Sequence, residues 1–319
     1  MSTLVTGGSG CIGAYVIRDL IAQGEEVVNY DADPGGGVLP QVLSSAGRDA
    51  LTTVRGDILD GHHLLRTMKE LGVERAIHLA ALQIPASNAN PPLAVQVNVG
   101  GLVNVLEAAR LLNLRSVLWA SSVAVFGPPQ EYAGKSIPNN GHHRPQSVYG
   151  ACKSLGEYLV EFYHREYHLN ATGFRFTAVY GVGRERGRSS FTTEMVRKAV
   201  AGEPYEVPFA DDIIDWQYVE DVSRLIVLAA DAEGHSTRIF STQGDLRPVR
   251  EGVAYLKKLA PDARLTMVPG AFGIMWNCDT TPLRRELGFE PKYSMEDGLF
   301  KTFNLYRIAA GLPPLERKP

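Results

Sequence analysis

The sequence has few cysteines, no long apolar run and no large excess of charge of one sign. Its three cysteines, Cys11, Cys152 and Cys278, are too few and too widely spaced for a disulfide framework or a zinc site, so we expect reduced thiols. No apolar run has the length of a membrane span, and the first residues do not form a secretory signal. A net charge of −3 offers no basic surface for nucleic acid. These absences predict a cytoplasmic protein without metal, membrane or nucleic-acid partners.

What the sequence has instead is an alternation of short apolar runs with helical patterns, from residue 1 to about residue 175. The apolar runs predict strands at Leu4–Thr6, Glu26–Tyr30, Thr52–Arg55, Ala76–Leu79, Ser116–Ala120 and Ala171–Phe176. Amphipathic spacing predicts helices between them, most clearly at Leu102–Leu112 and Tyr149–Tyr167. Such alternation is typical of an α/β fold with a doubly wound parallel sheet, the Rossmann architecture.

Beyond residue 176 the alternation becomes irregular. We expect helices at Phe191–Ala201 and Gln217–Ala230 and a strand at Leu265–Val268. The pattern therefore predicts a dinucleotide-binding domain at residues 1–175, to which segments around 214–242 return. Residues 176–319 are expected to form a smaller, discontinuous C-terminal domain that binds the substrate.

A glycine-rich segment, Thr6–Gly13, lies between the first predicted strand and the first predicted helix. Its three spaced glycines permit a tight turn, close approach of a pyrophosphate and close packing of the helix. Phosphates would then sit at the helix N-terminus, next to free N–H groups. The following strand ends at Asp31, where a carboxylate would accept ribose hydrogen bonds and repel a 2′-phosphate. This unit predicts NAD rather than NADP, with cofactor contacts from Gly7, Gly10, Cys11, Ile12, Gly13 and Asp31.

Tyr149 and Lys153 are four residues apart and would project from one face of a helix. A tyrosine with a pKa of about 10 becomes a useful base only where positive charge lowers that value. We expect the Lys153 ammonium to do this and also to hold the nicotinamide ribose. Ser122 would polarise the substrate oxygen, and Asn98 would fix Lys153 through water. The predicted catalytic residues are therefore Asn98, Ser122, Tyr149 and Lys153.

These segments resemble the extended short-chain dehydrogenase/reductase family over nearly the whole chain. Thr6–Gly13 is similar to its TGxxGxxG motif, Tyr149–Lys153 to its YxxxK motif, and Ser121–Gly127 to its serine segment. The resemblance implies a seven-stranded sheet with a smaller C-terminal domain. It also implies adenine contacts from Asp57 and Ile58, and cofactor contacts from Leu79, Ala80, Ala81, Asn98, Tyr149 and Lys153. A homodimer with a four-helix contact, made by Leu102–Leu112 and Tyr149–Tyr167, is implied as well.

Departures from the family pattern bear on the substrate. Nucleotide-sugar epimerases of the family typically carry asparagine where this chain has Ala178, and arginine where it has Ile214. A further arginine is expected before Asp279, but Pro269–Cys278 contains none. A buried diphosphate would lack charged partners here, which favours a small polar substrate. Trp119–Pro128 and Ala201–Glu206 partly resemble bacterial L-threonine dehydrogenases of the same family.

The expected substrate contacts come from strand ends and from a basic loop. Arg184, Arg186 and Arg188 either grip a substrate carboxylate or form a solvated basic loop, and both interpretations stay open. The histidine pairs His62–His63 and His142–His143 are interpreted as surface residues. The predicted substrate-binding residues are Gln83, Ser122, Tyr149, Thr177 and Arg188.

These predictions favour an NAD-dependent oxidoreductase that transfers hydride between the nicotinamide and a secondary alcohol or ketone carbon, with Tyr149 as acid and base. The alternative is a nucleotide-sugar (UDP-sugar) 4-epimerase or dehydratase with tightly bound NAD, because the same residues serve both reactions. A non-catalytic NAD sensor on this fold is disfavoured, since a sensor has no need to retain Ser122, Tyr149 and Lys153.

Overall fold

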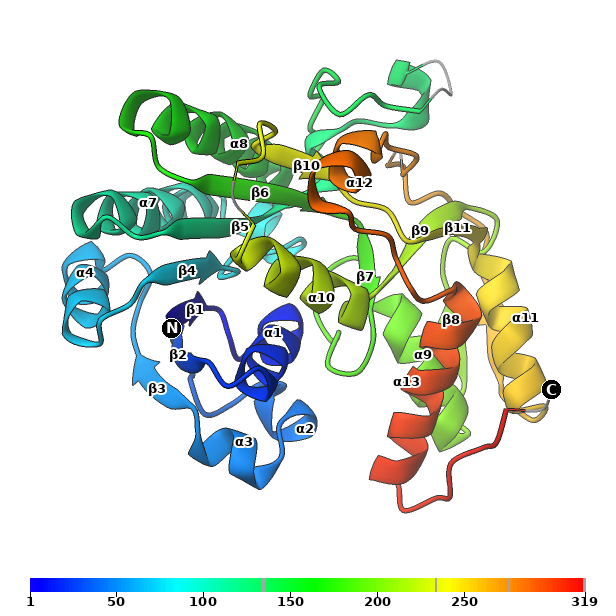
Figure 1. The fold of residues 1–319 in the computed structure, drawn as a ribbon. Helices are drawn as coiled ribbons and strands as arrows, with labels where there is room; N and C mark the ends of the chain where they lie inside the picture. Colours follow the sequence, from blue (N-terminus) through cyan, green and yellow to red (C-terminus); the bar gives the residue numbers. More distant parts are fainter. Residues whose placement is uncertain (133–135, 233, 275, 318–319) are drawn as a thin grey trace.

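A seven-stranded parallel sheet forms the centre of the computed structural model, which describes residues 1–132, 136–232, 234–274 and 276–317 (Figure 1). The strand order is β10-β6-β5-β4-β1-β2-β3, and every neighbouring pair is parallel. The seven strands are β1 (Ser2–Thr6), β2 (Glu26–Asp31), β3 (Thr52–Arg55), β4 (Arg75–His78), β5 (Ser116–Ser122), β6 (Ala171–Phe176) and β10 (Ile239–Ser241). The doubly wound α/β fold predicted from the sequence is confirmed.

Helices cover both faces of this sheet, and each face has its own apolar core. One core includes buried residues of α1 (Cys11–Ala22) and α10 (Val219–Ala230), which pack side by side (Figure 1). The other includes buried residues of α4 (Gly61–Glu70), α7 (Gly101–Leu112) and α8 (Val148–Tyr167). Short helical segments fill the connections: α2 (Leu39–Val42), α3 (Ser45–Asp49), α5 (Ala86–Ala89), α6 (Pro91–Val95), η1 (Gln96–Gly100), η2 (Val123–Val125) and η3 (Pro129–Tyr132).

Most of the remaining chain builds two small sheets and four helices on one side of the molecule (Figure 1). A three-stranded sheet has the order β11-β9-β7, and a two-stranded sheet pairs β12 with β8. Their bounds are β7 (Ala178–Tyr180), β8 (Tyr205–Val207), β9 (Ile213–Tyr218), β11 (Asp245–Pro248) and β12 (Leu265–Met267). The helices are α9 (Phe191–Ala201), α11 (Val249–Leu259), α12 (Thr281–Leu287) and α13 (Met295–Ala309).

The helix predicted at 217–230 begins two residues later, at Val219. Gln217 and Tyr218 belong to strand β9 instead, where they pair with Val179 and Tyr180 of β7. Continuous apolar spacing across this boundary does not distinguish the end of a buried strand from the first turn of a helix.

The carboxyl ends of β1, β4, β5 and β6 lie at one edge of the main sheet, as they must in a parallel sheet with this register. The loops that follow these strands therefore meet over that edge. Cys152 and Cys278 are buried, Cys11 is half-buried, and all three thiols are free. In the described part of the chain no helix is both long and apolar enough to cross a bilayer.

Candidate active site

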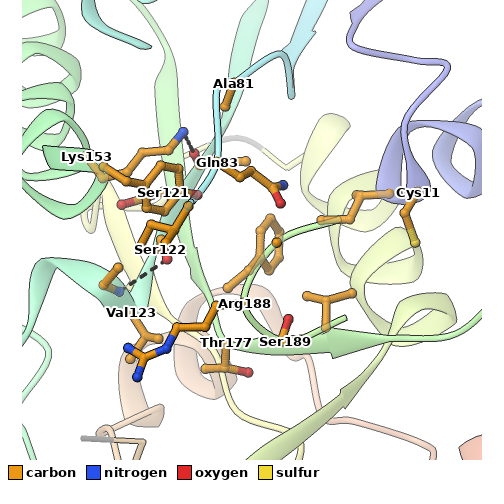
Figure 2. Close-up of a pocket in the computed structure, with 18 of the residues that line it drawn as sticks. Cys11, Ala81, Gln83, Ser121, Ser122, Val123, Lys153, Thr177, Arg188 and Ser189 are labelled. Carbon is orange, nitrogen blue, oxygen red and sulfur yellow. Dashed lines mark hydrogen bonds between the residues drawn. The ribbon is translucent and has the colours of Figure 1, made fainter. Parts of the chain in front are cut away.

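A pocket opens at this edge of the sheet and encloses about 990 Å³ of space outside the protein atoms, including its open mouth. It unites segments that are far apart in the sequence, and Figure 2 shows side chains from several of them pointing into it. The pocket is lined by thirteen of the residues predicted for the site: Gly7, Gly10, Cys11, Ile12, Gly13, Leu79, Ala81, Gln83, Ser122, Tyr149, Lys153, Thr177 and Arg188. Five predicted residues, Asp31, Asp57, Ile58, Ala80 and Asn98, are not among its lining residues.

The glycine-rich segment turns sharply between β1 and α1. Gly7 has φ +69°, and a Cβ there would come within 2.7 Å of the Ala80 backbone nitrogen, so only glycine allows this close approach. Ala80 thus supports the turn from behind instead of lining the pocket. Helix α1 begins at Cys11 with Gly10 as its N-cap, and neither a capping side chain nor an acidic residue occupies its first turn. The free N–H groups and the helix dipole fit a pyrophosphate at this position.

The residues predicted for the adenosine half lie beside this turn. The Asp31 carboxylate ends β2 and accepts hydrogen bonds from the backbone N–H groups of Ser9 at 3.1 Å and Asp33 at 3.0 Å. The Asp57 carboxylate accepts from the Leu59 N–H at 2.9 Å, and Ile58 is buried. Contacts of Asp31, Asp57 and Ile58 with a dinucleotide stay a prediction.

Ser122, Tyr149 and Lys153 converge from β5 and α8. Ser122 is the last residue of β5, and its Oγ accepts from the Ala124 N–H at 3.1 Å. Tyr149 is the second residue of α8, whose N-cap Ser147 accepts from the Gly150 N–H at 3.0 Å. The Lys153 Nζ donates to the Ala120 carbonyl at 2.6 Å and lies 5.5 Å from the centre of the Tyr149 ring. The hydroxyl, phenol and amine thus face one space.

The protonation equilibria of these groups are set by burial and by nearby charge. Burial raises the pKa of Tyr149, whereas the Arg184 guanidinium and a hydrogen bond with Ser122 lower it. Burial lowers the pKa of Lys153 to about 7. The sequence predicts Lys153 as the cation that favours the phenolate, and the structure adds the Arg184 guanidinium, whose charge also lowers the pKa of Tyr149.

Asn98 lies in the π-helical turn η1 and is buried. Its Oδ1 accepts from the Leu82 N–H at 2.7 Å, and its Nδ2 donates to the Leu82 carbonyl at 3.0 Å. Asn98 therefore holds the loop that follows β4, which carries Leu79, Ala81 and Gln83. Its predicted water-mediated link to Lys153 stays a prediction.

The basic loop at residues 183–190 divides between the pocket and the surface. Arg184 and Arg188 line the pocket, whereas Arg186 is exposed and does not. Gly187 has φ +90°, and a Cβ there would come within 2.5 Å of Gln83 Oε1, so the loop closes tightly against Gln83. Arg186 and Arg188 are both exposed, but only Arg186 lies outside the pocket lining, so the contact of Arg184 or Arg188 with a substrate carboxylate stays a prediction.

The lining also includes Phe272 and Ile274, which were not predicted for the site, and Trp276, which the sequence suggests as part of the core or of a pocket wall. They come from a segment without regular secondary structure, where no periodicity marks a buried face. The aromatic and apolar side chains of Phe272 and Ile274 do not by themselves distinguish a pocket wall from any other buried position.

A buried network lies behind Ser122. The Glu157 carboxylate accepts from Arg175 Nη2 at 2.7 Å and from Ser121 Oγ at 2.5 Å. His143 approaches the same carboxylate at 3.1 Å through Nε2, and its Nδ1 lies 2.7 Å from Ser154 Oγ. The interpretation of His143 as a plain surface residue is therefore wrong.

Comparisons with known proteins identify the family of the chain. Residues 3–241 match the family described as "NAD dependent epimerase/dehydratase family". The chain is 30% identical over 316 residues to a UDP-glucose 4-epimerase from Mycolicibacterium smegmatis, covering 96% of this chain and 99% of that protein.

Solved structures also align along nearly the whole chain. The UDP-glucose 4-epimerase of Thermus thermophilus, in complex with NAD, aligns with a TM-score of 0.82 and 26% identity, covering 96% of this chain and 99% of that one. An L-threonine dehydrogenase from Cupriavidus necator aligns with a TM-score of 0.85, covering 95% and 99%, and at 22% identity it shows the shared fold alone. The open helix end and the residues around it fit NAD, the cofactor of the matched family. The chain therefore belongs to the NAD-dependent epimerase/dehydratase family and is an enzyme of the extended short-chain dehydrogenase/reductase type.

Proposed function

We propose that the protein is a dehydrogenase that interconverts a secondary alcohol and a ketone on a small polar substrate, using NAD. The observation that carries the proposal is the convergence of Ser122, Tyr149 and Lys153 in one pocket with the open N-terminus of α1. A base, a hydrogen-bond donor and a dinucleotide cradle are together what alcohol oxidation requires.

Each residue has a separate task in this reaction. Bound NAD supplies the group that accepts hydride. Tyr149 takes the hydroxyl proton of the alcohol as a general base and returns a proton in the reverse direction. Ser122 donates a hydrogen bond to the substrate oxygen, and Lys153 holds the nicotinamide ribose.

The small-substrate proposal is supported by two side chains at the expected diphosphate positions. Ala178 and Ile214 are both 0% exposed and belong to the apolar core instead of the pocket lining. The Gln217 side chain on β9 accepts from the Thr177 backbone N–H at 3.1 Å and from its hydroxyl at 3.2 Å. These strands therefore direct no cation toward a diphosphate.

The second candidate function is that of a nucleotide-sugar 4-epimerase or dehydratase. The observation in its favour is the 30% identity with a UDP-glucose 4-epimerase over 96% of this chain. An epimerase returns its hydride to the substrate and leaves no lasting absorbance at 340 nm, whereas a dehydrogenase accumulates NADH. Micromolar binding of UDP by calorimetry would favour this candidate, and the dehydrogenase proposal predicts no saturable binding below the millimolar range.

The Tyr149→Phe variant tests the assigned mechanism. We expect kcat to fall by about 10²–10⁴-fold, because the proton-transfer group is lost, and NAD affinity to stay within about twofold. Tyr158→Phe is the matched control, since Tyr158 lies on the same helix and is 57% exposed. Equal activity of wild type and Tyr149→Phe would rule out Tyr149 as the acid and base.

We also propose a cytoplasmic homodimer. The support for a dimer is the group of exposed apolar side chains on α7 and α8: Leu111, Leu155, Tyr158 and Tyr167. Such a patch on two neighbouring helices suits a symmetric four-helix contact. Light scattering should give twice the chain mass for the wild type and a monomer for Leu155→Glu combined with Tyr158→Glu. The free cysteines support the cytoplasmic location, because the cytoplasm keeps thiols reduced.

A further inference from the structure

The substrate end of the pocket is built around one guanidinium. The Arg188 guanidinium stacks 4.3 Å above the Phe272 ring and lies 5.6 Å from the Phe209 ring. In Figure 2, Arg188 extends toward the side of the pocket where Ser122 and Val123 lie, away from Cys11 and the glycine-rich turn. Arg188 is therefore separated from the pyrophosphate cradle and lies with the residues that act on the substrate.

Two hydrogen-bond donors at this end have no acceptor. Among the described residues, none accepts a hydrogen bond from Arg188 or forms an ion pair with it. Trp276, which is 5% exposed and packs 5.0 Å from the Phe272 ring, also has an indole N–H without a partner. Buried donors are satisfied in most folded proteins, so the buried Trp276 N–H indicates a ligand that accepts hydrogen bonds. Arg188 is exposed, and its guanidinium beside the same ring is available to the same ligand.

The charge of the pocket lining also indicates a ligand that accepts hydrogen bonds. The sequence has 35 acidic and 32 basic residues, yet the described lining contains Lys153, Arg184 and Arg188 and no aspartate or glutamate. Asp212 is the acid that acts on Arg188, but it accepts from the Phe272 N–H and makes no ion pair with Arg188 among the described contacts. The cofactor phosphates account for positive charge at the glycine-rich turn, not at Arg188. The positive charge at Arg188 therefore suits an anionic group of the substrate.

We infer that the substrate is a hydroxy acid whose carboxylate binds Arg188 and the Trp276 N–H. This inference rests on the proposed dehydrogenase function. The planar guanidinium fork matches a carboxylate in two parallel hydrogen bonds, and a single fork suits one monoanion. In the reaction the carbinol C–H bond breaks with its electron pair moving to NAD, the O–H proton passes to Tyr149, and the carboxylate is unchanged. Alcohol is oxidised to ketone while NAD is reduced to NADH.

Matched pairs of compounds test the carboxylate directly. The enzyme saturated with NAD is assayed at 340 nm, and by thermal shift, with D-gluconate against D-glucitol, 3-hydroxybutyrate against 1,3-butanediol, and L-threonine against L-threoninol. We expect at least one acid to bind at least tenfold more tightly than its neutral partner. If no acid is preferred, the carboxylate inference is wrong. Turnover of a neutral alcohol in that case would leave the dehydrogenase function standing.

Variants of one loop then locate the anion site. With the preferred acid, Arg188→Gln should raise KM by about 30–100-fold and leave KM for NAD within twofold. Arg188→Lys should have a KM between those of the wild type and Arg188→Gln, because lysine restores the positive charge but lacks the planar guanidinium fork. Arg186→Gln is the matched control, since Arg186 lies on the same loop outside the pocket, and its KM should stay within twofold of wild type. An unchanged KM for Arg188→Gln would overturn the inference. Micromolar UDP binding that Arg188→Gln abolishes would do so as well, because Arg188 would then bind phosphate.

Discussion

The Arg175 guanidinium and the Glu157 carboxylate form a buried ion pair, 2.7 Å apart, with side chains that are 5% and 4% exposed. Arg175 lies on β6 and Glu157 on α8, one turn beyond Lys153. Because Ser121 of β5 donates to the same carboxylate, the pair ties two strands and the catalytic helix together directly behind Ser122. The position of Ser122 relative to Tyr149 and Lys153 therefore depends on charges that do not touch the substrate.

Glu157→Ala should lower the free energy of unfolding by about 3–5 kcal/mol, because it leaves Arg175 buried without its countercharge. Urea denaturation followed by circular dichroism measures this. Glu166→Ala is the control: Glu166 lies on the same helix, its side chain is 47% exposed in a surface pair with Arg165, and its loss should cost less than about 1 kcal/mol. Similar costs for the two variants would contradict the structural role of the buried pair.

Arg184→Gln should move the pH dependence of the reaction. The positive charge of Arg184 favours the Tyr149 phenolate and lowers its pKa, so removing that charge raises the pKa. The limb of kcat/KM that rises with pH as Tyr149 ionises is then expected at higher pH than in the wild type. Arg186→Gln, at an exposed position of the same loop, should leave the profile in place. A shift to lower pH in Arg184→Gln would be inconsistent with this electrostatic coupling.

Asp215→Asn should alter how stability depends on pH. Asp215 on β9 is fully buried and accepts from the Gly244 N–H at 2.7 Å, and burial raises its pKa to about 7. The unfolded chain ionises this group near pH 4, so the folded state keeps a proton that the unfolded state has lost, and stability falls as pH rises from about 4 to 7.

The asparagine has no proton to lose, so the variant should gain stability relative to wild type as pH rises, with a larger gain at pH 8 than at pH 5. Urea titrations at both values measure the difference. Asp262→Asn, an exposed position, should change stability by less than about 0.5 kcal/mol at either pH. If Asp215→Asn changes the free energy of unfolding by the same amount at pH 5 and at pH 8, the carboxyl is not protonated in the folded state.

Asp31→Ala should weaken NAD binding and reduce the discrimination against NADP. The carboxylate at the end of β2 is expected to bind the ribose hydroxyls and to repel a 2′-phosphate. Losing such a hydrogen bond to a charged group costs about 1.5–3 kcal/mol, about 10–100-fold in affinity. Fluorescence titration with NADH and NADPH measures both effects, with the exposed neighbour Asp33→Ala as control. A wild type that already prefers NADPH would refute the assignment of Asp31.

The main sheet could be predicted because its strands are short apolar runs bounded by turn residues. The predicted bounds Thr52–Arg55 and Ala171–Phe176 are those of β3 and β6. Helix α8 begins one residue before the predicted start at Tyr149, at the residue after its Ser147 cap. Signals of this kind depend only on residues within one or two helical turns along the chain, so a single sequence is enough to show them.

The substrate end could not be predicted to the same extent. Arg188, Phe272 and Trp276 meet across more than 80 positions of sequence, and only the packed chain brings them together. The effect of Arg184 on Tyr149 depends on the folded path of the loop at residues 183–190, which brings Arg184 to the pocket. Asn98 was recognised by its position, but its bonds to the Leu82 backbone follow from the path of a loop rather than from residue type.

Strand β10 determines when the main sheet can be completed during synthesis of the chain. It pairs Ile239, Phe240 and Ser241 with Gly173, Phe174 and Arg175 of β6, after about sixty residues that build other parts of the molecule. Until Ser241 has left the ribosome, β6 presents an unpaired row of backbone donors and acceptors, which is a template for wrong pairing with another nascent chain. Any truncated gene product that stops soon after Phe176 would keep that open edge permanently.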